Sequence, residues 1–279
     1  MKLLRQGKVK DIYDLENGQI LLHFSDRISA FDIKMSTNVP RKGEVLCKFG
    51  EYWFNILETP HHMIKLQDKD KMLAKKMDMI PMECVVRGYF YGGLLERYYK
   101  GVVNDILPSN FQPQKAARLP EPIFDPTTKS DIHDIPISKS QIVTAGLLSR
   151  KEFEYLKQTS VGLYKKMSDI AEKAGFIIAD VKFEFGRDSK TGNLVLGDSL
   201  GPDEFRLWSK SDYLPGRTQE SYDKQLLRDW LIDIGFKNKI EEFAKEGKKP
   251  DPPIIAPELV TKLTDRYIFA YEKITGKKM

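Results

Sequence analysis

One short segment, residues 178–186, constrains the fold of this chain more than any other. Its sequence, I-A-D-V-K-F-E-F-G, alternates polar with apolar residues. Successive side chains of a β-strand point to opposite faces of a sheet, so the alternation predicts a strand with Asp180, Lys182 and Glu184 on one face. The apolar residues between them would fill a core on the other face.

A second strand is predicted directly afterwards, over residues 194–198. The connection R-D-S-K-T-G-N is rich in turn residues, so the two strands are expected to form a hairpin that brings Asp198 near Glu184. Carboxylates on neighbouring strands are good oxygen ligands for Mg²⁺, which reaches proteins through one or two carboxylates plus substrate phosphates. The ordinary alternative is a solvated sheet face on which opposite charges pair across the ladder.

The composition limits the class of protein. Of the 279 residues, 41% are hydrophobic, which supports a substantial core, and the net charge of +5 is modest for this length. That charge suits anionic metabolites, and without a dense lysine–arginine block we expect no nucleic-acid partner. The N-terminus lacks an apolar signal core and no run is long enough to span a bilayer, so we expect a cytoplasmic protein without a membrane partner.

The patterns along the chain predict an α+β fold of two lobes. Residues 1–81 alternate short apolar runs with turns, which predicts a strand-rich lobe, and residues 82–279 predict a larger mixed lobe. The proline-rich stretch 107–136 is expected to be a long loop of the kind that carries function. The clearest helices are expected over residues 43–57, 150–174, 221–234 and 257–275, and Ser149 with Glu152 predicts a capping box before the second of them.

Two clusters outside the hairpin suit anions. Lys8 and Lys10 follow a glycine at the start of a predicted strand and lie on one side of it, so they could neutralise a polyphosphate; solvated surface lysines are the ordinary alternative. Arg87 ends a predicted buried strand and precedes a glycine pair and a helix-like run. This combination offers a bidentate cation and free backbone N–H groups to a phosphate. A surface arginine beside a turn is the alternative, and the sequence does not favour one over the other.

Taken in order, these clusters resemble the SAICAR synthetase family of purine biosynthesis, and the resemblance covers nearly the whole chain. It is carried by seven segments in register. These are G-K-V-K-D-I-Y (7–13), S-D-R-I-S-A-F-D (25–32), E-C-V-V-R-G-Y (83–89), L-P-E-P-I-F (119–124) with T-K at 128–129, D-V-K-F-E-F-G (180–186), R-L-W (206–208) and D-K-Q-L-L-R-D-W-L (223–231).

The resemblance implies an ATP-dependent ligase that joins L-aspartate to carboxyaminoimidazole ribonucleotide (CAIR). It also implies an N-terminal antiparallel-sheet lobe related to that of kinases, with ATP between the lobes. The implied nucleotide-binding residues are Lys8, Lys10, Met79, Glu83, Glu184 and Asp198, the last two as Mg²⁺ ligands. The implied catalytic residues are Lys182, on the transferred phosphate, and Asp180. The implied substrate contacts are Arg87 and Arg206 on the ribonucleotide 5′-phosphate, with Ser29, Asp32, Lys129 and Asp134 for aspartate and the imidazole.

Three positions depart from the family pattern. Gly93 stands where many members have serine, Ser199 replaces an acid after Asp198, and Arg41 replaces a glycine. The first two leave the details of phosphate and metal binding open. Whether the chain forms a homo-oligomer is also left open by the sequence.

Carboxylate activation through an acyl phosphate is the mechanism that the resemblance implies. The main alternative is a small-molecule kinase, which would share the ATP lobe but leave the phosphoryl group on its product. The chain lacks H-R-D and D-F-G, which argues against a protein kinase. A basic RNA-binding module is a third alternative, and the aromatic residues argue against it because they occupy predicted core positions.

Overall fold

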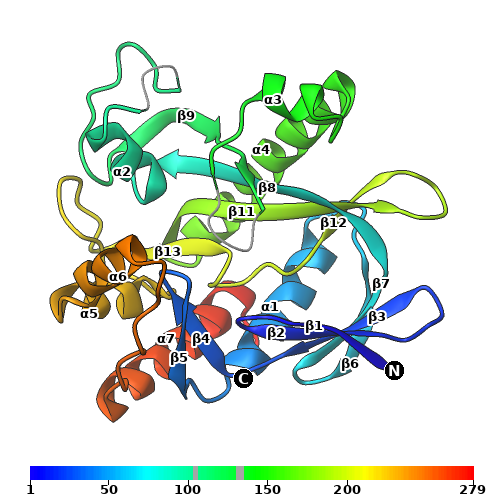
Figure 1. The fold of residues 1–279 in the computed structure, drawn as a ribbon, viewed down its shortest axis with the longest axis horizontal. Coiled ribbons are helices and arrows are strands. Elements are labelled where there is room, and N and C mark those ends of the chain that lie inside the picture. The colour runs from blue at the N-terminus through cyan, green and yellow to red at the C-terminus, as the bar shows by residue number, and fades with distance from the viewer. Residues whose placement is uncertain (103–105, 130–134) are drawn as a thin grey trace. The chain divides into compact units, whose positions relative to one another are not determined.

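The computed structural model describes residues 1–102, 106–129 and 135–279 (Figure 1). The fold is α+β with antiparallel sheets, as predicted. The chain forms two compact units. Unit 1 consists of Met1–Met77, Ser199–Asp203 and Ser221–Met279, and unit 2 consists of Asp78–Asp198 and Glu204–Glu220.

The first change of unit, after Met77, lies close to the predicted lobe boundary at residues 81 and 82. The C-terminal helices differ from the prediction, because Ser221–Met279 cluster with the N-terminal residues instead of the second lobe. The physical reason is the apolar face of the last helix, which packs against the first helix of unit 1; the Phe49 and Tyr271 rings meet edge to face with centroids 5.3 Å apart.

Within the described residues, unit 1 is built on a five-stranded antiparallel sheet and a separate two-stranded hairpin. In spatial order the sheet strands are β1 (Lys2–Gln6), β2 (Lys10–Asp14), β3 (Gln19–Phe24), β7 (Lys71–Lys75) and β6 (Met63–Asp68). The hairpin is formed by β4 (Arg27–Ala30) and β5 (Ile33–Asn38). The helices of unit 1 are α1 (Lys42–Ile56), α5 (Gln225–Asp233), α6 (Phe236–Lys245) and α7 (Pro257–Thr275).

Two helices of unit 1 begin and end close to the predicted positions. Helix α1 buries Val45, Phe49 and Trp53 at four-residue spacing and packs against β3 and β6. Helix α7 starts with Pro257, whose missing N–H costs nothing in the first turn. It ends at Gly276, which takes the left-handed conformation at φ 70° that favours glycine.

Unit 2 is built on a second sheet whose two longest strands are β8 (Met77–Tyr89) and β11 (Phe176–Asp188). The sheet order is β10 (Thr127–Thr128), β8, β11 and β12 (Leu194–Gly197), with β9 (Arg118–Phe124) paired to β8 and β13 (Phe205–Ser209) paired to β11. The helices are α2 (Gly93–Tyr99), α3 (Lys139–Thr144) and α4 (Arg150–Lys173). Helix α4 packs against β11 and β9, and Ser149 and Glu152 form its predicted capping box.

The prediction of an unbroken loop over residues 107–136 was wrong, because this stretch contains β9 and β10. Pro120 and Pro122 made the stretch read as loop, yet both lie within β9. Proline is tolerated in a strand where its missing N–H is not needed for the ladder. Long-range pairing with β8 therefore decided the conformation of this segment.

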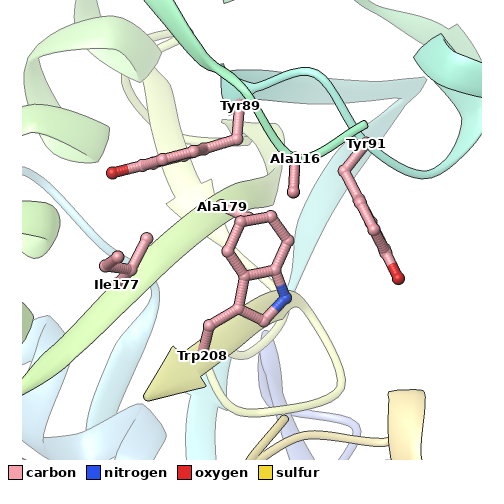
Figure 2. Packing of buried hydrophobic residues seen from close by; sticks show 6 residues of the cluster. All are labelled: Tyr89, Tyr91, Ala116, Ile177, Ala179 and Trp208. Atoms are coloured by element: carbon pink, nitrogen blue, oxygen red, sulfur yellow. The ribbon is translucent and has the colours of Figure 1, made fainter. Parts of the chain in front are cut away.

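One hydrophobic cluster in the core of unit 2 contains Trp208 (Figure 2). The Tyr89 and Tyr91 rings meet the indole edge to face, with centroids 5.3 and 5.1 Å away. The guanidinium of Arg206 lies over the Tyr91 ring at 5.8 Å, so the same aromatic cluster also contacts a charged residue of β13.

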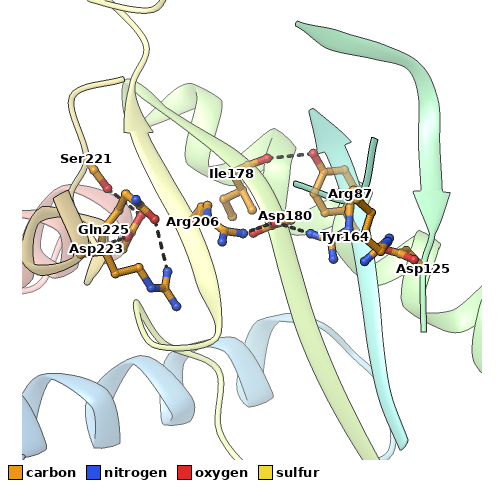
Figure 3. Close-up of polar contacts among 11 residues, drawn as sticks. Arg87, Asp125, Tyr164, Ile178, Asp180, Arg206, Ser221, Asp223 and Gln225 are labelled. Atoms are coloured by element: carbon orange, nitrogen blue, oxygen red, sulfur yellow. Dashed lines mark hydrogen bonds and ion pairs between the residues drawn. The ribbon is translucent and has the colours of Figure 1, made fainter. Parts of the chain in front are cut away.

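Tyr164 of α4 makes close contacts with both β11 and β8 in unit 2. The Tyr164 hydroxyl donates a hydrogen bond to the carbonyl of Ile178 at 2.8 Å (Figure 3). Gly88 lies directly against that hydroxyl, and a Cβ at this position would overlap it. Glycine is therefore required at position 88 by a neighbouring side chain.

A buried ion pair lies in unit 1. Lys42 Nζ donates to Asp203 Oδ2 at 2.7 Å, and the Tyr267 hydroxyl donates to Oδ1 at 2.9 Å. The side chain of Lys42 is 0% exposed. Burial acts to raise the pKa of Asp203, but Lys42 and Lys224 outweigh it and hold that pKa well below its usual range.

We expect Asp203→Asn to lower the free energy of unfolding by about 3–5 kcal/mol, because it leaves the Lys42 ammonium buried without a counter-charge. Chemical denaturation at pH 7 measures this loss. The double variant Lys42→Met/Asp203→Asn should lose less, since no buried charge remains unpaired. An equal or larger loss in the double variant would contradict the explanation.

Candidate functional site

The predicted hairpin of charged strands is present in unit 2. Strands β11 and β12 pair antiparallel, and Glu184 lies opposite Gly197, the residue before Asp198. Asp198 has φ 58°, in the left-handed region, and follows the last residue of β12. The hairpin prediction is confirmed, but β12 ends one residue earlier than predicted, so Asp198 directly follows the strand that pairs with the strand of Glu184.

Lys182 lies among carboxylates on this sheet. Its Nζ donates to Glu83 Oε1 at 2.8 Å and to Glu184 Oε1 at 3.0 Å. The second oxygen of Glu184 accepts from Lys129. The short strand β10 places Lys129 beside this group, because Lys129 directly follows the strand. Thr127 of β10 pairs with Glu83 in register and also donates to its Oε2 at 3.1 Å. We call Glu83, Lys129, Lys182 and Glu184 the lysine–carboxylate cluster.

The electrostatics keep Lys182 charged. Burial acts to lower the pKa of its ammonium, but the carboxylates of Glu184, Glu83, Asp198 and Glu204 outweigh burial and raise that pKa well above its usual value. Lys182 is therefore a fixed cation near neutral pH. Such a group can neutralise charge on a transferred phosphate, and it cannot accept a proton as a general base.

A second set of charges in unit 2 forms a continuous chain (Figure 3). Arg87 Nη1 donates to Asp180 Oδ2 at 2.9 Å, and Arg206 donates to the same oxygen. Arg87 Nε donates to Asp125 Oδ2 at 2.5 Å, which Arg97 Nη2 also reaches at 2.6 Å. We call Arg97, Asp125, Arg87, Asp180 and Arg206 the arginine–aspartate chain.

Asp180 belongs to a different group of charges from Lys182, although both lie on β11. The pairing of β11 with β13 shifts register between Ile178, opposite Leu207, and Val181, opposite Phe205. Three steps along β11 thus match two along β13, and a β-bulge of this kind re-aims local side chains. The single charged array that the alternation predicted is divided into two, while the predicted catalytic role of Asp180 stays a prediction.

The arginines lie against a glycine pair at the start of α2. A Cβ at Gly92 would come within 2.5 Å of Arg206 Nη2, and the φ of Gly92 is +59°. Both the space and the backbone conformation therefore favour glycine at this position. The predicted combination of Arg87 with a glycine-rich helix start is present.

The predicted residues of unit 1 form two contacts of their own. Lys8 Nζ lies 2.5 Å from Asp32 Oδ1, and Lys10 Nζ donates to Ser199 Oγ at 2.9 Å. Ser29 lies on β4 and is largely buried. These contacts orient both lysines.

Two predicted site residues remain, Met79 and Asp134. Met79 lies on β8 and is 38% exposed. Asp134 lies outside the described residues.

Sequence reasoning missed two charged residues of the site. Arg97 lies one helical turn after Gly93, so its position on the same face of α2 could have been anticipated from the spacing. Asp125 had no such signal, because its partner Arg87 is distant in sequence. It is 3% exposed, and a carboxylate so deeply buried needs partners.

The residues present suit a divalent cation in part. Among the described residues, no group of three or more His, Cys, Asp and Glu side chains could hold a metal ion alone. Glu184, on β11, and Asp198, directly after β12, offer hard oxygen donors, and Lys182 and Lys129 compensate the charge of Glu184. This donor set fits Mg²⁺ that arrives with substrate phosphates, which supply further oxygens.

The structure predicts a pH-dependent role for Asp125 in stability. Burial acts to raise the pKa of Asp125, but Arg87 and Arg97 outweigh it and lower that pKa. A lowered folded-state pKa gives stability that is present above the unfolded pKa of about 3.9 and is lost as the pH falls through the folded value. Asp125→Asn should therefore lower Tm at pH 7, and the difference from wild type should shrink below about pH 4. A Tm difference independent of pH between 7 and 3 would argue against this origin.

This chain is similar to known proteins of one family. A family model described as SAICAR synthetase matches residues 3–246. A protein of Nitrosopumilus maritimus (strain SCM1), named phosphoribosylaminoimidazole-succinocarboxamide synthase, is 50% identical over 279 residues and is covered completely, as is this chain.

Solved structures agree with these sequence matches. The SAICAR synthase of Saccharomyces cerevisiae complexed with SAICAR has a TM-score of 0.84 at 33% identity, covering 100% of this chain and 96% of the other. A type-2 SAICAR synthetase in complex with ADP has a TM-score of 0.75 at 27% identity, covering 99% of this chain and 98% of the other.

Proposed function

The chain belongs to the SAICAR synthetase family, and from that membership we propose that it is an ATP-dependent ligase that condenses L-aspartate with the carboxylate of CAIR. The products are SAICAR, ADP and phosphate, in purine biosynthesis. The relative that is 50% identical over the whole chain supports this, as do the structural neighbours complexed with SAICAR and with ADP. In the geometry, the proposal rests on Lys182, a permanent cation held between two carboxylates of one sheet.

The chemistry requires activation of a carboxylate. Attack of an amine on a bare carboxylate is slow because the leaving group is an oxide. Transfer of the γ-phosphoryl group of ATP to a CAIR carboxylate oxygen releases ADP and gives an acyl phosphate. The aspartate nitrogen then attacks the carbonyl carbon, the C–O bond to phosphate breaks, and the nitrogen loses a proton. The protein supplies position and charge neutralisation.

The lysine–carboxylate cluster has the groups for the phosphoryl step. Lys182 would lie on the transferred phosphate and offset its negative charge. Glu184 and Asp198 would hold Mg²⁺. When bound, this ion supplies Lewis-acid neutralisation of phosphate oxygens. Glu83 keeps the ammonium of Lys182 oriented through the 2.8 Å hydrogen bond.

The remaining roles follow the resemblance residue by residue. Lys8 and Lys10 would contact the ATP phosphates, and Met79 and Glu83 would contact the adenine.

On the substrate side, Arg87 and Arg206 would bind the 5′-phosphate of the ribonucleotide, and Asp180, which accepts from both arginines, would position them. Contacts to aspartate and the imidazole are proposed for Ser29, Asp32, Lys129 and Asp134. Within the described residues, no helix combines the length and apolarity needed to cross a bilayer. We also propose that the protein is cytoplasmic and that its partners are the small molecules CAIR, L-aspartate and ATP.

The reaction itself is the first test. Purified protein with MgATP and CAIR should release ADP at a steady rate only when L-aspartate is present, and SAICAR should form in equal amount. Coupled ADP detection and chromatography of the imidazole products measure both. The rival activity, a small-molecule kinase, would instead give a stable phosphorylated product and ADP release indifferent to aspartate.

We expect Lys182→Met to lower kcat by about 10²–10³-fold, because a charge that stabilises the transferred phosphoryl group is lost. Steady-state kinetics with saturating ATP, CAIR and aspartate measure this loss. Lys190→Met is the matched control, since Lys190 is an exposed lysine in the turn between β11 and β12. Near-normal turnover of Lys182→Met would remove this residue from the reaction centre.

A further inference from the structure

Arg97 is the one member of the arginine–aspartate chain that lies on α2. Its Nη2 donates to Asp125 Oδ2 at 2.6 Å, the oxygen that Arg87 Nε also uses. Asp125 is 3% exposed, whereas the side chain of Arg97 keeps 18% of its surface exposed. A buried carboxylate therefore fixes one end of each guanidinium and leaves Arg97 accessible.

The guanidinium groups converge on the glycine pair that begins α2. A Cβ placed on Gly93 would lie 3.6 Å from Arg97 Nη1 and 3.7 Å from Arg87 Nη2. The aspartates accept from other nitrogens of the same two arginines, namely Arg97 Nη2 and Arg87 Nε and Nη1. The Arg206 guanidinium lies against Gly92. Donor groups from three arginines thus lie against two consecutive positions at which the backbone carries no side chain.

The charge of this group suits a phosphate monoester. Three arginines and two aspartates, Asp125 and Asp180, leave a net charge of +1 at the glycine pair. A phosphate monoester carries about −1.5 to −2 at pH 7 and offers three acceptor oxygens, so it can accept from several guanidinium groups at once.

We infer that Arg97 is a third arginine that contacts the 5′-phosphate of the ribonucleotide, and that Asp125 is the residue that positions it. The inference rests on the proposed function, in which Arg87 and Arg206 bind that phosphate. Its basis is the shared Asp125 oxygen together with the convergence of Arg97 Nη1 and Arg87 Nη2 on Gly93.

A purely structural role for Arg97 makes a different prediction. An ion pair that only neutralises Asp125 would lower Tm when broken and leave substrate preference unchanged. A phosphate contact changes the affinity for ligands that carry the phosphate and spares those that lack it. The two roles are therefore separated by comparing a nucleotide with its nucleoside.

The test is Arg97→Gln, assayed for KM of CAIR, ATP and aspartate and for inhibition by SAICAR and by its dephosphorylated nucleoside. We expect KM for CAIR and the inhibition constant of SAICAR to rise about 10- to 100-fold, the loss of one charge-assisted hydrogen bond. The KM values of ATP and aspartate and the inhibition constant of the nucleoside should stay within about twofold of wild type, since none of these three ligands occupies the site of the ribonucleotide 5′-phosphate.

Two further variants sharpen the result. Arg97→Lys keeps the charge without the planar fork and should recover part of the lost affinity; it also serves if the glutamine variant does not fold. In Asp125→Asn, KM for CAIR should rise while kcat stays closer to wild type. Arg118→Gln is the matched control, because Arg118 is an exposed arginine on β9 of the same unit and should leave every constant unchanged.

Two results overturn the inference. One is an unchanged KM for CAIR in Arg97→Gln, and the other is an equal weakening of nucleotide and nucleoside. Failure of the proposed function looks different, because wild-type protein would then form no SAICAR at all. In that event calorimetry with ribose 5-phosphate compares wild type and Arg97→Gln directly, and equal affinities would reject a phosphate contact.

Discussion

Lys182 is held between Glu83 of β8 and Glu184 of its own strand β11, and the lysine–carboxylate cluster is arranged around this cation. A cation in contact with so many carboxylates stays protonated, and each carboxylate in turn needs a positive partner to remain ionised away from water. Lys129 fills that requirement for Glu184. The two lysines and two glutamates of the lysine–carboxylate cluster balance in charge, so in the proposed function the phosphate and Mg²⁺ would exchange partners with them.

Strand β11 contributes residues to two charge clusters of different composition in unit 2. The lysine–carboxylate cluster offers oxygen ligands together with a fixed ammonium, whereas the arginine–aspartate chain offers guanidinium groups at a glycine pair. The β-bulge between Ile178 and Val181 separates them. In the proposed function, the transferred phosphoryl group and the bound 5′-phosphate would therefore use different cations.

The sequence allowed much of this arrangement to be predicted. The alternation over residues 178–186 identified β11 and its charged face, turn residues identified the hairpin with β12, and the capping box located the start of α4. Each of these signals is local, because strand alternation and helix capping act over a few residues.

What could not be predicted depends on distant pairing. Arg87 and Asp125 meet only because β9 and β10 pair with β8, and the prolines within β9 and before β10 made this stretch read as a loop. The separate partners of Asp180 depend on one inserted residue in the ladder, which alternation alone does not reveal. The C-terminal helices joined unit 1 through an apolar face, and the sequence pattern does not name the surface against which such a face packs.

The contact between Gly88 and Tyr164 constrains how this region can change over evolutionary time. The hydroxyl that occupies the space beside Gly88 also holds the carbonyl of Ile178, next to the bulge. Any residue larger than glycine at position 88 therefore becomes tolerable only in a lineage that has already replaced the tyrosine. The order of substitution is fixed, and descendants should show the two positions varying together.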